Sequence, residues 1–274
     1  MARTLPHPSG AITYDLHGHG PPILLLHSAG HDRRDFDGLI APLAERHAVY
    51  ALDLPGFGES PAADPDAVTA WAIADAVRDF ARALDLPPSV IVGNSVGGFA
   101  ALRLAAREPR RVRGLVLVDP GGFTEHGPIT RAFCRVQGSP WVRRATGHAF
   151  ARWYVRDRGP ASRAMLERVR EAEARDDVAR AHASLWRSFA EPGSDATEDA
   201  RATTCPTLLA WGRRDPVSRA DAEGRRAREL LPHARWAPFD CGHVPFVERP
   251  EEFLAELQRF LAELPALERA DAHV

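Results

Sequence analysis

The strongest chemical signal in the chain is a serine at the centre of a Gly-x-Ser-x-Gly sequence, Gly93-Asn94-Ser95-Val96-Gly97. The apolar run at residues 90–92 precedes it and a helical pattern follows, which predicts a sharp strand-to-helix turn at Ser95. Such a turn packs so closely that a side chain two residues before or after the serine has no room, and glycine occupies both positions. A glycine-rich turn that merely closes a strand is the alternative, and the flanking patterns favour a nucleophile.

A serine hydroxyl is a weak nucleophile unless a base takes its proton. His243 is the predicted base, because it follows the last predicted strand and precedes the last predicted helix. Asp215 lies just past another strand end and completes the order Ser, Asp, His along the chain. We therefore expect Asp215 to orient the imidazole of His243. Asp119 also follows a strand end and is the rival acid.

Short apolar runs alternate with longer helical patterns along most of the chain. Runs bounded by Gly, Pro or Asp are typical of strands that are buried on both faces. Their alternation with amphipathic helices predicts an α/β fold in which a mostly parallel, twisted sheet is flanked by helices. The predicted strands are residues 23–26, 48–52, 90–92, 115–118, 207–211 and 235–239, and the clearest predicted helices are residues 73–84, 99–106 and 253–261.

This alternation stops between residues 121 and 204, where helical patterns follow one another without a strand run. A helical insertion between two strands of one sheet explains the change with the fewest assumptions. We therefore expect a core domain in two parts, residues 1–120 and 205–274, interrupted by a helical segment at residues 121–204.

Five blocks of sequence follow one another in order: residues 20–27 (GPPILLLH), residues 53–60 (DLPGFGES), the Ser95 segment, the Asp215 loop and the His243 loop. Together they resemble the α/β-hydrolase fold superfamily, in particular its lid-bearing serine hydrolases, and the resemblance covers almost the whole chain. It implies an α/β-hydrolase fold with a nucleophile elbow at Ser95 and a catalytic triad of Ser95, His243 and Asp215. It also implies that residues 121–204 form a lid over Ser95.

The same resemblance implies an oxyanion hole made of two backbone amides. The family's first amide lies two residues after the His of an His-Gly pair, which corresponds here to Ala29, and the second follows the nucleophile, at Val96. Each such donor stabilises a tetrahedral intermediate by about 3 kcal/mol. Ser28 replaces the usual glycine of that pair. His27 and Asp53 resemble family positions that brace these loops, and we expect a structural role for both.

The predicted lid is rich in arginine and in aromatic residues. Between residues 131 and 180 there are twelve arginines and six acidic residues. We expect these arginines on solvated helix faces, with pairs such as Glu171 and Arg175 at i,i+4, and attraction of an anionic substrate is the alternative. We expect an apolar substrate pocket whose lining includes Phe133, Trp141, Trp153 and Trp186 from the lid and Val244 beside His243.

Composition excludes several classes of function. All 35 basic residues are arginine, so the chain has no lysine for a Schiff base or a phosphate loop. The net charge of -2 gives no support to nucleic-acid binding. Three cysteines, and no signal-peptide-like or membrane-spanning run, lead us to expect a soluble, cytoplasmic protein without a membrane partner. We expect no cofactor and no metal site, since His17 and His19 are typical of a turn, and oligomeric state is left open.

These features favour a serine hydrolase that cleaves a small-molecule carboxylic ester or related acyl substrate through an acyl-enzyme. One alternative is C–C bond hydrolysis of ring-fission (meta-cleavage) products, because the elbow is similar to that subfamily's Gly-Asn-Ser-Met-Gly-Gly. The chain departs from that subfamily at residues 27–30, where it lacks a glycine-rich loop, and at Val244, where the subfamily usually has Trp. Perhydrolysis and a non-enzymatic ligand receptor on the same fold are further alternatives. Ser95 excludes relatives with an aspartate nucleophile, the epoxide hydrolases and dehalogenases.

Overall fold

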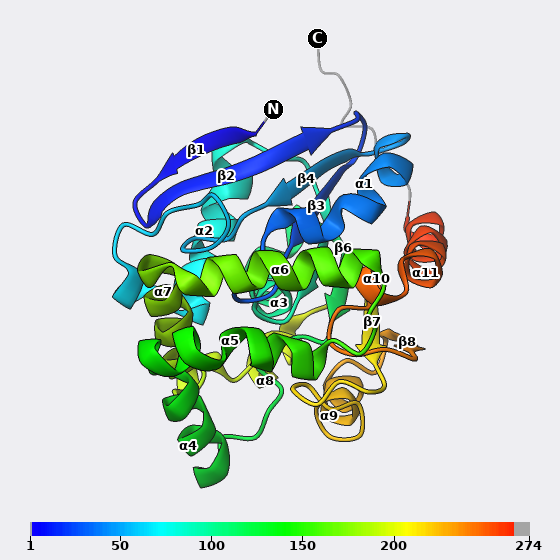
Figure 1. The fold of residues 1–274 in the computed structure, drawn as a ribbon. Coiled ribbons are helices and arrows are strands. Elements are labelled where there is room, and N and C mark those ends of the chain that lie inside the picture. Colours follow the sequence, from blue (N-terminus) through cyan, green and yellow to red (C-terminus); the bar gives the residue numbers. More distant parts are fainter. Residues whose placement is uncertain (1, 266–274) are drawn as a thin grey trace.

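The predicted parallel strands lie side by side in one twisted sheet with helices on both faces (Figure 1). The computed structural model describes residues 2–265. Met1 and residues 266–274, which belong to the two predicted parts of the core, lie outside the described residues.

Within residues 2–265, eight strands form the sheet in the order β1-β2-β4-β3-β5-β6-β7-β8. β2 pairs antiparallel with β1 and with β4, and the remaining neighbours pair parallel, which confirms the predicted mostly parallel sheet. The strands are β1 (Arg3–His7), β2 (Gly10–His17), β3 (Pro22–Leu26), β4 (Ala48–Leu52), β5 (Ser89–Asn94), β6 (Val112–Val118), β7 (Thr207–Gly212) and β8 (Arg235–Phe239).

The edge hairpin β1–β2 was not among the predicted strands. Most of β1 is exposed and β2 is buried only at its centre, from Ile12 to Tyr14. An edge hairpin of this kind needs no continuous apolar run, because one of its faces remains in water. The pattern that identified the central strands is therefore missing from the hairpin.

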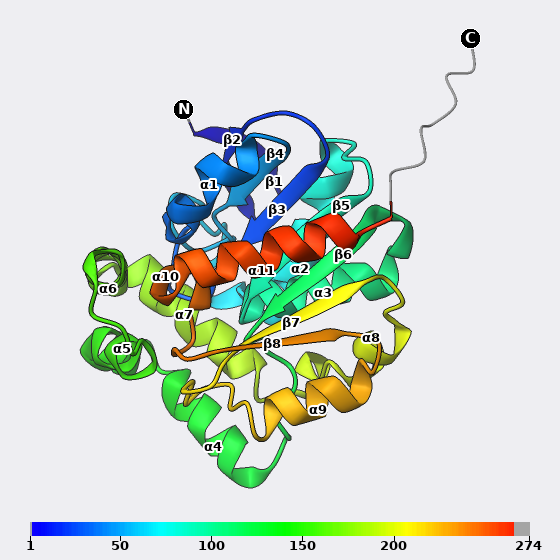
Figure 2. The same cartoon turned by 90° about the vertical axis from the view of Figure 1, so that its right-hand side faces the viewer.

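Two apolar layers enclose the central strands, since successive strand residues point to opposite faces. In β3, Leu24 and Leu26 pack into the layer under α2 (Ala70–Ala83) and α3 (Val96–Arg107). Ile23 and Leu25 pack into the opposite layer, under α1 (Asp37–Ala44) and α11 (Pro250–Glu263). Figure 2 shows α1 and α11 in front of the sheet, with α2 and α3 behind it.

The segment between β6 and β7 is helical, and in Figure 2 most of its helices gather beside one end of the sheet. It contains α4 (Pro128–Gln137), α5 (Pro140–Tyr154), α6 (Pro160–Ala174), α7 (Asp176–Ser188) and α8 (Thr197–Ala202). Proline stands in the first turn of α4, α5 and α6, where its missing N–H costs nothing. The other helices are α9 (Glu223–Leu230), α10 (Pro245–Glu248) and the short 3-10 turns η1 (Arg33–Phe36), η2 (Pro65–Ala67), η3 (Pro109–Arg111) and η4 (Pro192–Ser194). No helix among residues 2–265 is both long enough and apolar enough to cross a membrane.

Candidate active site

Ser95 occupies the turn between β5 and α3, with backbone angles φ 54° and ψ −114°. A residue other than glycine rarely adopts a positive φ, and such strain persists only where the surrounding structure enforces it. A Cβ at Gly93 would lie 2.3 Å from the carbonyl oxygen of Gly97, and a Cβ at Gly97 would lie 2.4 Å from that of Leu26. Both flanking glycines therefore have the steric role that the sequence predicts.

His243 and Asp215 lie on neighbouring loops beyond the ends of β8 and β7 and are both buried. The imidazole Nδ1 lies 2.6 Å from Asp215 Oδ2, and Asp215 Oδ1 accepts a hydrogen bond of 2.8 Å from the Val217 amide. The hydrogen bond to a carboxylate places the proton on Nδ1, so Nε2 is the nitrogen left to accept a proton. Asn94 Nδ2 donates to the His243 carbonyl at 3.0 Å, which ties this loop to β5.

Asp119, the rival acid, lies beside the pair. Asp119, Asp215 and His243 each have a carboxylate oxygen or a ring nitrogen that lies within 4.8 Å of those of the other two residues. The Gly212 amide donates to both carboxylate oxygens of Asp119, at 3.0 and 3.2 Å. Burial, and then the neighbouring Asp215, raises the pKa of Asp119 well above its usual range. The imidazole is hydrogen-bonded to Asp215, while Asp119, whose pKa burial raises, lies beside the pair.

These same three residues are the one group of potential metal ligands among residues 2–265 whose donor atoms converge. The hydrogen bonds of His243 to Asp215 and of Gly212 to Asp119 account for their arrangement. His17 and His19 are exposed and take no part in this group.

Ala29 and Val96, the predicted oxyanion donors, lie on the two loops that flank Ser95. Val96 is the first residue of α3, where an amide has no acceptor within the helix. Ala29 lies in the loop after β3, in which Gly30 has φ +76°. Ser28 has no positive φ, so its replacement of glycine costs no strain there. Its carbonyl instead accepts from His27 Nδ1 at 2.6 Å.

His27 and Asp53 connect the loops around the site. His27 Nε2 accepts from the Leu54 amide at 2.9 Å, and burial lowers the pKa of His27, which keeps the ring neutral for this role. Asp53 accepts from the Arg33 amide at 2.7 Å and from the Glu59 amide at 2.8 Å, and it is paired with the Arg33 guanidinium. These contacts agree with the bracing role expected from the sequence.

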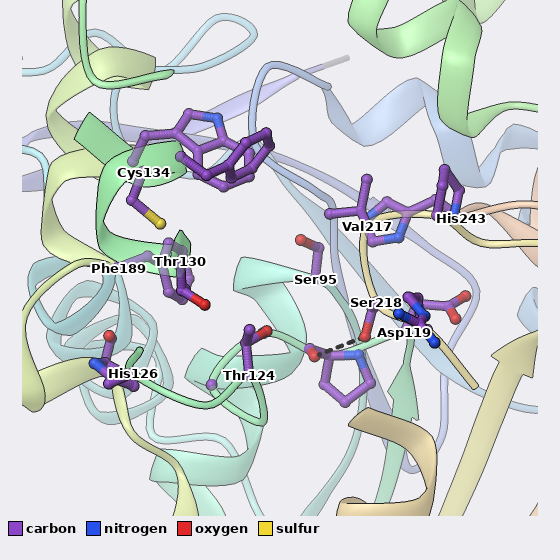
Figure 3. A pocket seen from close by; sticks show the side chains of 18 of the residues that line it. Ser95, Asp119, Thr124, His126, Thr130, Cys134, Phe189, Val217, Ser218 and His243 are labelled. Atoms are coloured by element: carbon purple, nitrogen blue, oxygen red, sulfur yellow. Dashed lines mark hydrogen bonds between the residues drawn. The ribbon is translucent and has the colours of Figure 1, made fainter. Parts of the chain in front are cut away.

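Two cavities adjoin Ser95. The larger has a volume of about 400 Å³ and the smaller one of about 40 Å³. In Figure 3, Ser95 lies between Val217 and His243 on one side and Phe189, Thr130 and Cys134 on the other. Ser95 and His243 line both cavities.

The structure brings three of the five predicted substrate-binding residues to these cavities. Phe133, Trp153 and Trp186 line the larger one, and Trp186 also lines the smaller one. Trp141 and Val244 line neither. Trp141, at the start of α5, is 77% exposed, whereas Val244 is fully buried among apolar side chains.

Several lining residues were not among those predicted. Phe189 and Val217 line both cavities, and Ile129, Thr130 and Cys134 line the larger one. Val217 lies only two residues after Asp215, which is the one sequence signal that pointed to it.

Half of the twelve arginines between residues 131 and 180 form ion pairs with carboxylates. These are Arg143, Arg144, Arg168, Arg170, Arg175 and Arg180. Arg175 pairs with Asp177 at 2.7 Å, in place of the expected Glu171. Most of these pairs are exposed, as expected for solvated helix faces, but Arg143 and Glu173 are buried.

Comparisons with known proteins show the family to which the chain belongs. Residues 23–257 match the sequence model described as the alpha/beta hydrolase family. The chain is 32% identical over 273 residues to pimeloyl-(acyl-carrier protein) methyl ester esterase of Xanthomonas campestris pv. campestris, covering 92% of this chain and 99% of that protein.

Solved structures share the fold. The enol-lactonase from Burkholderia xenovorans LB400 superposes with a TM-score of 0.84 at 21% identity, over 95% of this chain and 100% of that one. A thermophilic esterase from Thermogutta terrifontis gives a TM-score of 0.79 at 24% identity, over 96% and 98% of the two chains.

Proposed function

The chain belongs to the alpha/beta hydrolase family, and on that premise we propose that it is a serine hydrolase that cleaves carboxylic esters or related acyl compounds. The observation that carries the proposal is the hydrogen bond from His243 Nδ1 to Asp215, which leaves Nε2 as the proton acceptor in cavities that Ser95 also lines. The relative named as a methyl ester esterase, matched over nearly its full length, supports ester chemistry.

In the proposed reaction, Ser95 Oγ attacks the acyl carbon while His243 Nε2 takes its proton. The amides of Ala29 and Val96 donate to the oxyanion of the tetrahedral intermediate, and loss of one such donor typically costs about 10²–10³ in kcat. His243 then returns the proton to the departing alcohol, which leaves an acyl group on Ser95. Water, deprotonated by His243, attacks that acyl group and releases the acid. Asp215 stabilises the imidazolium formed in both halves.

We also propose that residues 121–204 act as the lid of this site. Its helices α4, α5 and α7 contribute Phe133, Trp153 and Trp186 to the larger cavity. The end of α5 is joined to the catalytic loop, because the His243 amide donates to the Tyr154 carbonyl at 3.1 Å. A lid attached at this point controls which groups reach Ser95.

Covalent labelling by a fluorophosphonate tests the proposed nucleophile. The wild type should label and Ser95→Ala should not. Ser218→Ala is the matched control, because Ser218 lines the same cavity and should leave labelling at Ser95 intact. Equal labelling of the wild type and Ser95→Ala would overturn the proposal. A panel of chromogenic esters with one dienoate, run beside Ser95→Ala, separates ester hydrolysis from C–C bond hydrolysis.

A further inference from the structure

Three side chains besides Ser95 and His243 border both cavities. The cavities share five lining residues, of which Ser95 and His243 are the proposed reacting groups. The other three, Trp186, Phe189 and Val217, border both cavities beside these reacting groups, and we call them the wall. Because Ser95 borders both cavities, a substrate bound there can extend into each of them.

Trp186 is held in this wall by aromatic contacts and by a hydrogen bond. Its ring packs edge-on against Phe133 and Phe150, with centroids 5.4 and 5.8 Å away, and against Phe189 at 6.4 Å. The indole Nε1 donates to His182 Nε2 at 3.1 Å. Contacts on several sides leave the indole little freedom to move out of the wall.

His182 is the end of a buried polar chain that the proposed reaction does not use. Its Nδ1 lies 2.6 Å from Glu173 Oε1, and the same carboxylate oxygen lies 3.3 Å from Arg143 Nη2. Nδ1 therefore carries the proton, and Nε2 is free to accept from Trp186. Burial, and then the nearby Arg143, lowers the pKa of His182, which keeps Nε2 unprotonated.

Two glycines make room for this chain next to the oxyanion loop. A Cβ at Gly30, one residue after Ala29, would lie 2.9 Å from the His182 ring. A Cβ at Gly147 would lie 2.7 Å from the Glu173 carboxyl carbon. The chain that holds Trp186 therefore packs directly against the loop that carries the proposed oxyanion donor.

The two volumes set the size of the group that fits on each side. The smaller cavity, at about 40 Å³, has one tenth of the volume of the larger one, so it admits only a small substituent. The 400 Å³ cavity is in the range of sites that bind whole small molecules, and it is lined by Ile129, Phe133, Trp153 and Trp186.

We propose that Trp186, positioned by His182, makes the enzyme selective for esters with one small substituent and one larger apolar substituent. This inference rests on the proposed function. Two kinds of ester fit this description: a short acyl group on a bulky alcohol, and a short alcohol on a bulky acid. Two series of esters show which kind the enzyme prefers.

The first series lengthens the acyl chain from acetyl to octanoyl on a fixed naphthyl alcohol. The second lengthens the alcohol from methyl to octyl on a fixed octanoic acid. We expect kcat/KM to fall sharply as the varied group lengthens in one series and to change little in the other. In apolar pockets each excess methylene changes kcat/KM by about 10–200-fold.

Trp186→Ala should join the two cavities. In the series in which the wild type rejects long groups, this variant should raise the ratio of kcat/KM for the longest ester to kcat/KM for the shortest ester at least tenfold. Trp141→Ala is the matched control, because Trp141 is exposed and lines neither cavity, and it should keep the wild-type ratio. His182→Leu removes the acceptor and should also raise the ratio, whereas His182→Gln keeps an acceptor and should restore selectivity. The ratio reports on the position of Trp186, because a general loss of folded protein lowers both rates equally.

If the wild type labels at Ser95 but accepts long groups equally well in both series, this inference is overturned and the proposed function stands. The same result follows if folded, labelled Trp186→Ala keeps the wild-type size limit. A wild type that neither labels nor hydrolyses any ester would overturn the proposed function and this inference with it.

Discussion

Replacement of Asp119 by asparagine tests how the buried carboxyl pair is charged. Asp119 is fully buried and has φ +42°, which asparagine tolerates better than most residues. An amide can accept from the Gly212 N–H as the carboxyl does, and it can donate toward Asp215 as a neutral carboxyl does. The substitution therefore keeps one acceptor oxygen for the Gly212 N–H and removes the proton that Asp119 can gain or lose.

The expected effect is a change in how stability depends on pH. An unfolded chain releases the aspartate proton near pH 4. Because the pKa of Asp119 is raised in the folded state, the folded protein holds one proton more than the unfolded chain between pH 4 and that raised pKa. Over this window the wild type loses about 1.4 kcal/mol of stability for each unit of rising pH. Asp119→Asn has no such proton, so its stability relative to the wild type should rise by the same amount per unit.

Urea unfolding followed by tryptophan fluorescence at pH 5, 6 and 7 measures this difference. Asp240→Asn is the control, because the Asp240 side chain is 69% exposed and a surface change should alter stability little at any of these pH values. A difference that stays constant with pH, or falls as pH rises, would refute the reasoning. Activity gives a second readout: Asp119→Asn should stay within about tenfold of the wild type, whereas Asp215→Asn should lose on the order of 10⁴-fold in kcat.

Three further predictions concern the elbow, its bracing and the charged segment. Gly97→Ala should lower ester turnover and cost about 1–3 kcal/mol of stability, measured by urea unfolding, because its Cβ would meet the Leu26 carbonyl at 2.4 Å. Full activity and stability would show that the turn accommodates a Cβ without strain. His27→Ala leaves the Leu54 N–H buried without its acceptor and should destabilise by about 1–3 kcal/mol in the same assay, and an unchanged midpoint would count against the bracing role. Comparison of anionic and neutral esters at low and high salt tests the arginines of residues 131–180. Because half of these arginines are paired, we expect equal salt dependence, and selective loss of the anionic ester's rate would instead favour substrate attraction.

The elements that the sequence predicted well are those with a local cause. The central strands are buried on both faces, so every residue from Ile23 to Leu26 is apolar whatever its neighbours in space are. The turn at Ser95 requires glycine at positions 93 and 97 for steric reasons that lie within one stretch of chain. Local causes of this kind leave a pattern that the sequence shows directly.

Elements governed by contacts between distant segments left no such pattern. Trp141 and Trp186 are the same residue type in the same helical region, yet one is exposed and the other borders two cavities. The difference follows from the packing of α5 and α7 against the core, and from His182 and Glu173, which meet only in the folded chain.

The sequence by itself therefore determined the order of the central strands and helices, the strained turn at Ser95 and the candidate residues His243 and Asp215. Only the tertiary structure decided that the imidazole bonds to Asp215 while Asp119 stands beside it with a pKa raised by burial. Both acids follow strand ends between Ser95 and His243, so sequence position made Asp215 the expected acid but did not exclude Asp119. The geometry of the sheet decides between the two acids, because it sets which carboxyl reaches His243 Nδ1 and how deeply the other is buried.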